Sequence, residues 1–177
     1  TTRSHPDTLS ILFKRAVDMG VHRLVLCDTS GHSTPEGVAN LVRWTRDWVG
    51  PSIKLDWHGH NDRGLGLINS MAAIEAGCVR IHGTCLGIGE RVGNTSIDQL
   101  ILNLKLLGLY HGDTRALGRY TRLVSRTCGV PIPYNYPVFG ADAFRTATGV
   151  HAAAVIKAEQ KGQPDWADLV YSSVPAR

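Results

Sequence analysis

The sequence predicts an α/β fold in which helices cover a parallel sheet, and two observations support this prediction. Over the first two-thirds of the chain, short aliphatic runs typical of buried strands alternate with stretches in which apolar residues recur at helical spacing. In each repeat, a loop rich in glycine and polar residues follows the strand. A doubly wound sheet and a (β/α) barrel both have this pattern, and both place functional residues at the carboxyl ends of their strands.

The first helix and strand follow from local signals near the N-terminus. Ser4 is expected to cap a helix whose first turn contains Pro6 and an acidic residue. Gly20 is expected to end this helix. Residues 22–27 are an aliphatic run, as expected of a strand that is buried on both faces.

The pattern then repeats. Thr34 is the expected N-cap of the second helix, which Pro35 begins and Gly50 ends. The later elements expected in this part of the chain are strands at residues 53–57 and 79–83 and helices at residues 65–75 and 96–107. The sequence thus predicts three consecutive β/α units.

After Gly108 the alternation stops. A helix is expected at residues 113–128, and residues 141–161 are expected to be mostly helical with a break at Gly149. A proline-rich connector lies between these stretches, and there is no clear prediction for the tail. We therefore expect a sheet-containing part at residues 1–108 and a helical extension at residues 109–177. One face of the first of these helices carries a row of arginines, which favours a solvated surface over an anion-binding one: Arg115, Arg119, Arg122 and Arg126.

Composition excludes several classes of protein. With 43% hydrophobic and 19% charged residues over 177 positions, the chain is expected to be globular rather than disordered. It has no apolar stretch of about 18 residues and no hydrophobic signal core at its start, so we expect a soluble, cytoplasmic protein. A net charge of +4 is weak evidence for nucleic-acid binding. The chain begins with Thr1 instead of methionine, which suggests that the natural start is missing.

The cysteines predict no disulfide scaffold. Four cysteines are scattered without a C-x-x-C pair, so reduced and mostly buried thiols are expected. Cys85 is expected to be a small buried side chain, because no base neighbours it in the sequence.

Two histidines at the end of the second strand are the strongest candidates for chemistry. His58 and His60 are two residues apart, and side chains two apart on a strand point to the same face. Two imidazoles at one strand end are a start for a divalent metal site, although a chance pair of polar loop residues remains the alternative. Asn61 and Asp62 are candidates to orient the ring nitrogens.

The loops after the other two strands add further candidates. The glycines at 87–94 have the wrong spacing for nicotinamide binding, but this loop places Glu90, Arg91 and Asn94 near the same strand ends. An amide oxygen such as that of Asn94 is a plausible metal ligand. In the first loop, Asp28 is either a metal ligand or a carboxylate that orders the turn, and Thr29 is a candidate hydrogen-bond donor to a substrate carboxylate.

Together these motifs resemble those of the metal-dependent acyltransferases that include 2-isopropylmalate, homocitrate and citramalate synthases. The motifs are DTSGHSTP, HGHND and GTCLGIGERVGN, and the resemblance continues into FGADAFRTATGVHAAAVIKA near the C-terminus. Lyases that cleave hydroxymethylglutaryl-CoA (HMG-CoA) share the two histidines, but the G-E-R-x-G-N element favours the synthases. The resemblance implies a (β/α)8 TIM barrel, of which this chain holds about the last three units, followed by helical subdomains.

The resemblance also implies roles for individual residues. His58, His60 and Asn94 would hold a divalent ion (Mg, Mn, Zn or Co), and Thr29 would contact the carboxylate of a 2-oxo acid. His151 is similar to a histidine that reaches the active site of the partner subunit in a homodimer; as a lone histidine it would be expected to be structural. A tyrosine that accompanies this histidine resembles Tyr171. Glu90 and Arg91 belong to the G-E-R-x-G-N element and are taken as candidate catalytic residues.

The implied activity is that of a 2-isopropylmalate synthase. Such an enzyme condenses acetyl-CoA with 2-oxoisovalerate, releases CoA and serves leucine biosynthesis; homocitrate, citramalate or citrate formation are the alternatives. The first five strands of the family barrel, with an arginine, an aspartate ligand and a glutamate, have no counterpart in this chain. A second hypothesis is therefore that this polypeptide is inert alone and completes a partner chain.

Overall fold

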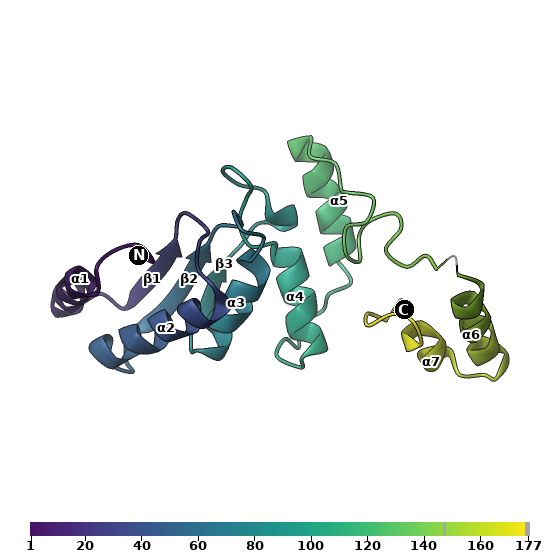
Figure 1. Cartoon of the computed structure of the whole chain (residues 1–177), viewed down its shortest axis with the longest axis horizontal. Helices are drawn as coiled ribbons and strands as arrows, with labels where there is room; N and C mark the ends of the chain where they lie inside the picture. Colours follow the sequence, from purple (N-terminus) through teal and green to yellow (C-terminus); the bar gives the residue numbers. More distant parts are fainter. Residues whose placement is uncertain (147, 176–177) are drawn as a thin grey trace. The chain divides into compact units, whose positions relative to one another are not determined.

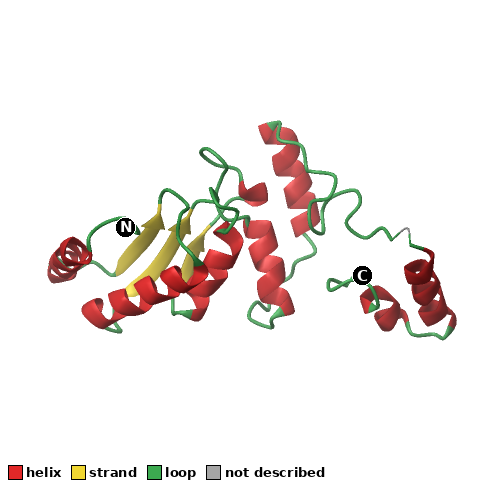
Figure 2. Cartoon of the chain, viewed as in Figure 1, coloured by secondary structure: helices red, strands yellow, loops and turns green. Residues whose placement is uncertain are grey.

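The computed structural model describes residues 1–146 and 148–175. It divides into two compact units, Thr1–Lys105 and Leu106–Arg177. The first unit contains a three-stranded parallel sheet in the order β1-β2-β3 (Figure 2). The strands are β1 (Arg23–Asp28), β2 (Lys54–Gly59) and β3 (Arg80–His82). The predicted parallel sheet of consecutive β/α units is thus confirmed.

Helices α2 (Pro35–Val49) and α3 (Gly66–Glu75) cover one face of this sheet (Figure 1). Helix α1 (Pro6–Asp18) packs against α2, and α4 (Ile97–Leu106) follows β3 after a short 3-10 turn at Cys85–Gly87. The core lies between α2, α3 and the sheet, where Leu55 and Trp57 are fully buried. Because side chains alternate along a strand, Asp56 and His58 lie on the opposite face of β2.

Strand β1 is not buried on both faces, contrary to the expectation. Leu26 is fully buried in the core, whereas Val25 on the other face is 36% exposed. Strand β1 is an edge strand of the three, and the two N-terminal residues lie along its outer edge. The backbone N–H of Thr2 donates to the carbonyl oxygen of Cys27 at 3.2 Å, and the hydroxyl oxygen of Thr1 accepts from the N–H of Cys27 at 3.0 Å.

Local capping signals set the helix starts. Thr34 caps α2 as predicted, accepting from the N–H of Gly37 at 3.2 Å. The predicted cap of α1 is wrong by one residue: His5 is the N-cap, and its ring nitrogen accepts from the N–H of Asp7. The imidazole nitrogen of His5 accepts from the N–H of Asp7, the same group that the hydroxyl of Ser4 was expected to accept from.

The second unit contains α5 (Leu117–Cys128), α6 (Gly149–Gln160) and α7 (Pro164–Leu169). Helix α5 begins later than predicted, because residues 113–115 form a turn in which Asp113 accepts from the backbone and side chain of Arg115. The helix predicted at 141–161 is wrong in its first part. Residues 141–146 form turns, in which Asp142 donates its N–H to the carbonyl of Tyr134. Ala147 lies outside the described residues.

The arginine row and the cysteines differ in how exposed they are to solvent. The four arginines of the predicted row are all exposed, which agrees with a solvated face. The four cysteines, all of which the structure describes, form no disulfide with one another; Cys78 and Cys85 are buried, and Cys128 is exposed. Among the described residues, no helix is long and apolar enough to span a membrane.

Candidate functional site

The loops that follow the three strands meet at one end of the sheet. The N–H of His60 donates to the carbonyl of Asp28 at 3.2 Å, which joins the second loop to the end of β1. The N–H of Asn61 donates to the carbonyl of Gly93 at 3.0 Å, and His60 and Asn94 form an antiparallel bridge. These backbone bonds bring the first and third loops against the second, as the alternation of strands and polar loops predicted.

His58 and His60 share one face, as their spacing predicted. Their ring centroids are 5.2 Å apart and the rings are edge to face. Burial lowers the pKa of His58, and the electrostatic influence of the neighbouring imidazoles of His60 and His82 lowers it further. A lowered pKa favours the neutral imidazole, which is the form that binds a metal ion.

His82 is a third imidazole at this place that the sequence analysis missed. It pairs in register with His58 across β2 and β3, and the two ring centroids are 5.6 Å apart. The signal that could have found it is its position in the predicted third strand, because residues in register on parallel strands share a face.

The bridge partners His60 and Asn94 each have a buried side-chain atom that lacks a hydrogen-bond partner among the described residues. They are Nδ1 of His60 and the side-chain oxygen Oδ1 of Asn94. A buried polar atom without a partner is costly, and a bound cation would satisfy both atoms. Imidazole nitrogen and amide oxygen are donors that divalent ions accept. Within residues 1–146 and 148–175, no three His, Cys, Asp or Glu side chains form a metal site on their own. The donor set therefore fits a divalent ion only with the amide of Asn94 included.

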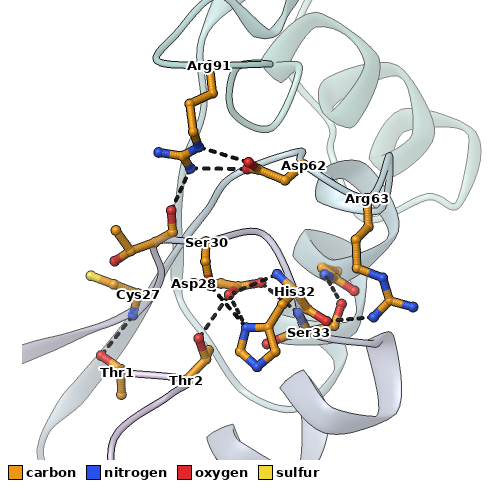
Figure 3. A network of polar contacts seen from close by, with 12 residues as sticks. Thr1, Thr2, Cys27, Asp28, Ser30, His32, Ser33, Asp62, Arg63 and Arg91 are labelled. Carbon is orange, nitrogen blue, oxygen red and sulfur yellow. Dashed lines mark hydrogen bonds and ion pairs between the residues drawn. The ribbon is translucent and has the colours of Figure 1, made fainter.

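Asp28 orders the first loop, which decides between its two predicted roles. Its carboxylate is fully buried and accepts from the hydroxyl of Thr2 at 2.9 Å and from the N–H of Ser33 at 3.0 Å. It also contacts His32 through that residue's N–H and ring (Figure 3). Burial alone would raise the pKa of Asp28, but these hydrogen bonds outweigh it and the pKa is lowered. Both carboxylate oxygens are thus engaged within the protein, which supports the turn-ordering role.

The predicted support of the histidine rings by Asn61 and Asp62 is wrong. The side-chain oxygen of Asn61 accepts from the N–H of Gly66 at the start of α3, at 2.8 Å. The carboxylate of Asp62 pairs with Arg91 instead. The free N–H groups at the start of α3 attract the amide oxygen of Asn61 more strongly than a ring nitrogen does. The guanidinium of Arg91 does the same for the carboxylate of Asp62.

Arg91, Glu90 and Thr29 lie at the mouth formed by the loops. Arg91 donates two hydrogen bonds to Asp62 and one, of 2.6 Å, to the backbone oxygen of Thr29. Thr29 itself is exposed. The carboxylate of Glu90 is 81% exposed and lies 3.8 Å from the guanidinium of Arg91.

His151 and Tyr171 lie together in the second unit. Their ring centroids are 4.0 Å apart with an angle of 30° between the ring planes. His151 lies on α6 and Tyr171 follows α7, so the packing of α6 and α7 against each other brings the two rings together.

Comparisons with known proteins agree with the geometry. Residues 1–124 match the HMGL-like family model. The chain is 38% identical over 165 residues to a protein of Methanopyrus kandleri named "Probable 2-isopropylmalate synthase", a match that covers 92% of this chain and 33% of that protein. It is 35% identical over 174 residues to a homocitrate synthase of Methanothermobacter thermautotrophicus, covering 96% of this chain and 43% of that protein. The chain thus spans well under half the length of these relatives.

Solved structures show the same fold. An HMG-CoA lyase from Acinetobacter baumannii, in complex with coenzyme A and 3-methylmalate, aligns with a TM-score of 0.63 and 28% identity over 71% of this chain and 43% of that one. An HMG-CoA lyase from Pseudomonas aeruginosa aligns with a TM-score of 0.64 and 22% identity over 72% of this chain and 44% of that one, and supports the fold alone. With three β/α units in the order of a TIM barrel and a family model matched over most of its length, the chain belongs to the HMGL-like family.

Proposed function

We propose that this chain is the C-terminal part of the catalytic barrel, with the start of the helical extension, of a 2-isopropylmalate synthase. The active protein would then be this chain together with the first five strands of the barrel, in one polypeptide or two; we refer to it as the assembled enzyme. It condenses acetyl-CoA with 2-oxoisovalerate and releases CoA. The observation that carries the proposal is the pair of unpartnered buried atoms on His60 and Asn94 beside His58. The names of the similar synthases support the class of reaction.

In this proposal His58, His60 and Asn94 hold a divalent ion, of which Mg, Mn, Zn and Co are candidates. A bound divalent ion acts as a Lewis acid that polarises the ketone of the 2-oxo acid. The protein's part is to present neutral imidazoles, which the lowered pKa of His58 favours, and a side-chain amide oxygen.

The substrate is held by the first loop. The hydroxyl of Thr29 donates a hydrogen bond to the carboxylate of the 2-oxo acid and so fixes its orientation. Thr29 is exposed at the end of β1, and its backbone oxygen is tied to Arg91, which limits the movement of the residue. The backbone around the donor is thereby held before the substrate binds.

His151 and Tyr171 serve the proton transfer. A base must remove a proton from the methyl group of acetyl-CoA, and an imidazole in contact with a phenol suits this step. By the family resemblance, these residues act in the active site of the partner subunit of a homodimer. In this proposal the enzyme is cytoplasmic and serves leucine biosynthesis. Homocitrate and citramalate synthesis are the alternative reactions.

An assay of CoA release tests the reaction and the second hypothesis together. The chain alone, and then the assembled enzyme, is given a divalent metal, acetyl-CoA and a panel of 2-oxo acids. We expect no release from the chain alone, because three strands cannot close a barrel, and release from the assembled enzyme that is fastest with 2-oxoisovalerate. Release by the 177 residues alone would show that they need no other strands. No release with any 2-oxo acid would refute the synthase.

Metal binding tests the site directly. His58→Ala in the assembled enzyme is expected to abolish stoichiometric Mn²⁺ binding, measured by electron paramagnetic resonance of free Mn²⁺. His22→Ala is the matched control, since His22 is an exposed histidine before β1, at the other end of the strand from the loops. Stoichiometric Mn²⁺ binding by the His58 variant would contradict the assignment of the ligands.

A further inference from the structure

One arginine links all three loops of the site. Nε and Nη2 of Arg91 donate to the two carboxylate oxygens of Asp62 at 2.8 and 3.0 Å, and Nη2 also donates to the backbone oxygen of Thr29 at 2.6 Å (Figure 3). Thr29 follows β1, Asp62 follows β2, and Arg91 itself follows β3. A single guanidinium therefore connects the ends of three strands that are far apart in the sequence.

The backbone around this contact is adapted to it. Arg91 has a φ of 55°, a left-handed conformation that is unfavourable for a residue other than glycine. Gly31, in the first loop, lies so close to Asp62 that a Cβ atom there would be 2.6 Å from its backbone nitrogen. Any side chain at position 31 would therefore displace Asp62. Both loops thus adopt unusual local geometry at the place where the ion pair forms.

Arg91 and Asn94 lie in one hydrogen-bonded turn of the third loop, so the position of one depends on that of the other. The N–H of Gly93 donates to the carbonyl of Glu90 at 2.8 Å, and the N–H of Asn94 donates to the carbonyl of Gly87 at 2.8 Å. The carbonyl of Gly93 in turn accepts from the second loop. Because the turn is closed on both sides of Arg91, holding the guanidinium also holds the backbone of Asn94 beside that of His60, its bridge partner.

The ion pair contributes more to geometry than to stability. The side chains of Arg91 and Asp62 are 42% and 28% exposed, and ion pairs that solvent reaches contribute little to the stability of a fold. A two-pronged contact between guanidinium and carboxylate nevertheless fixes a direction and a distance. The hydrogen bonds with Arg91 lower the pKa of Asp62, and those with Asp62 raise the pKa of Arg91, so both groups stay charged at neutral pH.

We infer that Arg91 is a positioning residue: through Asp62 and the backbone of Thr29 it sets the place of Asn94 opposite His58 and His60. This inference rests on the proposed function, because Asn94 matters here as a ligand of the divalent ion. It assigns to Arg91 a role that acts through another residue, in place of the catalytic role that the G-E-R-x-G-N resemblance suggested.

The test uses Mn²⁺ as the probe in the assembled enzyme. Arg91→Met and Asp62→Asn are each expected to weaken Mn²⁺ binding about tenfold, as removal of a residue behind a ligand commonly does. The double variant is expected to be no weaker than either single variant, because both remove the same contact. Arg91→Lys keeps the charge but not the two-pronged contact, and its Mn²⁺ affinity should lie between those of the wild type and Arg91→Met.

Arg63→Met is the matched control. Arg63 is the neighbour of Asp62 and also crosses between loops, but its guanidinium donates to the backbone oxygen of His32 at 2.6 Å and so joins the second loop to the first. Its loss is expected to change Mn²⁺ affinity less than twofold. An equal loss of affinity in this variant would mean that any loosening of the loops has the same effect, and would overturn the role of Arg91.

Hydrogen exchange in the metal-free assembled enzyme separates this inference from the proposed function. Arg91→Met should speed exchange of the amides at residues 88–95 and leave those of α2 unchanged. Unchanged exchange, or wild-type Mn²⁺ affinity in the Arg91→Met variant, would overturn the inference. If the wild type binds no Mn²⁺, the proposed function fails, and the exchange rates still decide whether Arg91 holds the third loop.

Discussion

The carboxylate of Asp28 is buried at the end of β1 and accepts hydrogen bonds from Thr2, His32 and Ser33. Asp28→Ala leaves these donors without a partner, so we expect the free energy of unfolding at pH 7 to fall by about 2 kcal/mol. The pKa of Asp28 is lower in the folded protein than its ordinary value of 3.8. Its contribution is therefore complete above that value and is lost as the pH falls through the lower folded value.

Urea unfolding of the assembled enzyme, followed at pH values from 7 down to 3, checks this expectation. The difference between wild type and Asp28→Ala should shrink toward the acid end of the series. Asp18→Ala is the control, because Asp18 is an exposed carboxylate at the end of α1. A difference that stayed constant across the series would show that the carboxylate's charge plays no part.

At the residue scale, the sequence predicted what depends on local spacing. His58 and His60 could be placed on one face because strand side chains alternate, and the loop of Asn94 because polar residues follow each strand. The pairing of Asp62 with Arg91 could not be predicted. These residues are 29 positions apart, and they meet only because three separate strands end at the same edge of the sheet.

At the scale of the element, the prediction succeeded for α2, where Thr34 and Gly50 mark the two boundaries. Thr34→Ala is expected to destabilise the protein by about 1 kcal/mol, because the N–H of Gly37 loses its acceptor at the start of α2. Thr34→Ser keeps a hydroxyl and should retain most of the stability. Urea unfolding measures both variants, and equal stability of wild type and Thr34→Ala would show that solvent replaces the cap without loss.

The helical prediction failed at residues 141–146, and the reason is tertiary. The alanines at positions 141 and 143 favour a helix by composition, but the preceding proline-rich segment folds back on this stretch. Gly140 donates to the carbonyl of Tyr136, and Asp142 donates to that of Tyr134. These turn bonds occupy the backbone groups that a helix would need, so the helix begins only at Gly149.

At the scale of the whole molecule, the order of the units predicted a parallel sheet of consecutive β/α units, but it could not predict that such a sheet closes into a barrel. Three parallel strands in sequential order are compatible with a doubly wound sheet or a barrel, and only the family model and the solved structures decide for the barrel. The sheet ends on both sides in strands whose outer backbone groups can accept a neighbour. On the outer edge of β1, the backbone of Cys27 already forms hydrogen bonds with the hydroxyl of Thr1 and the N–H of Thr2.

From the contacts on the outer edge of β1 we predict how the first five strands of the barrel join this sheet. A preceding strand that continues into Thr1 and Thr2 would extend the contact along β1, and a barrel closes only if β3 also gains a partner. Amide hydrogen exchange of the chain should therefore slow at least tenfold in both β1 and β3 when a polypeptide with the first five strands is added. The amides of α2, which lie against the existing core, are the internal control and should not change. Slowing at β1 alone would indicate an open sheet that grows at one edge, and it would contradict a closed barrel.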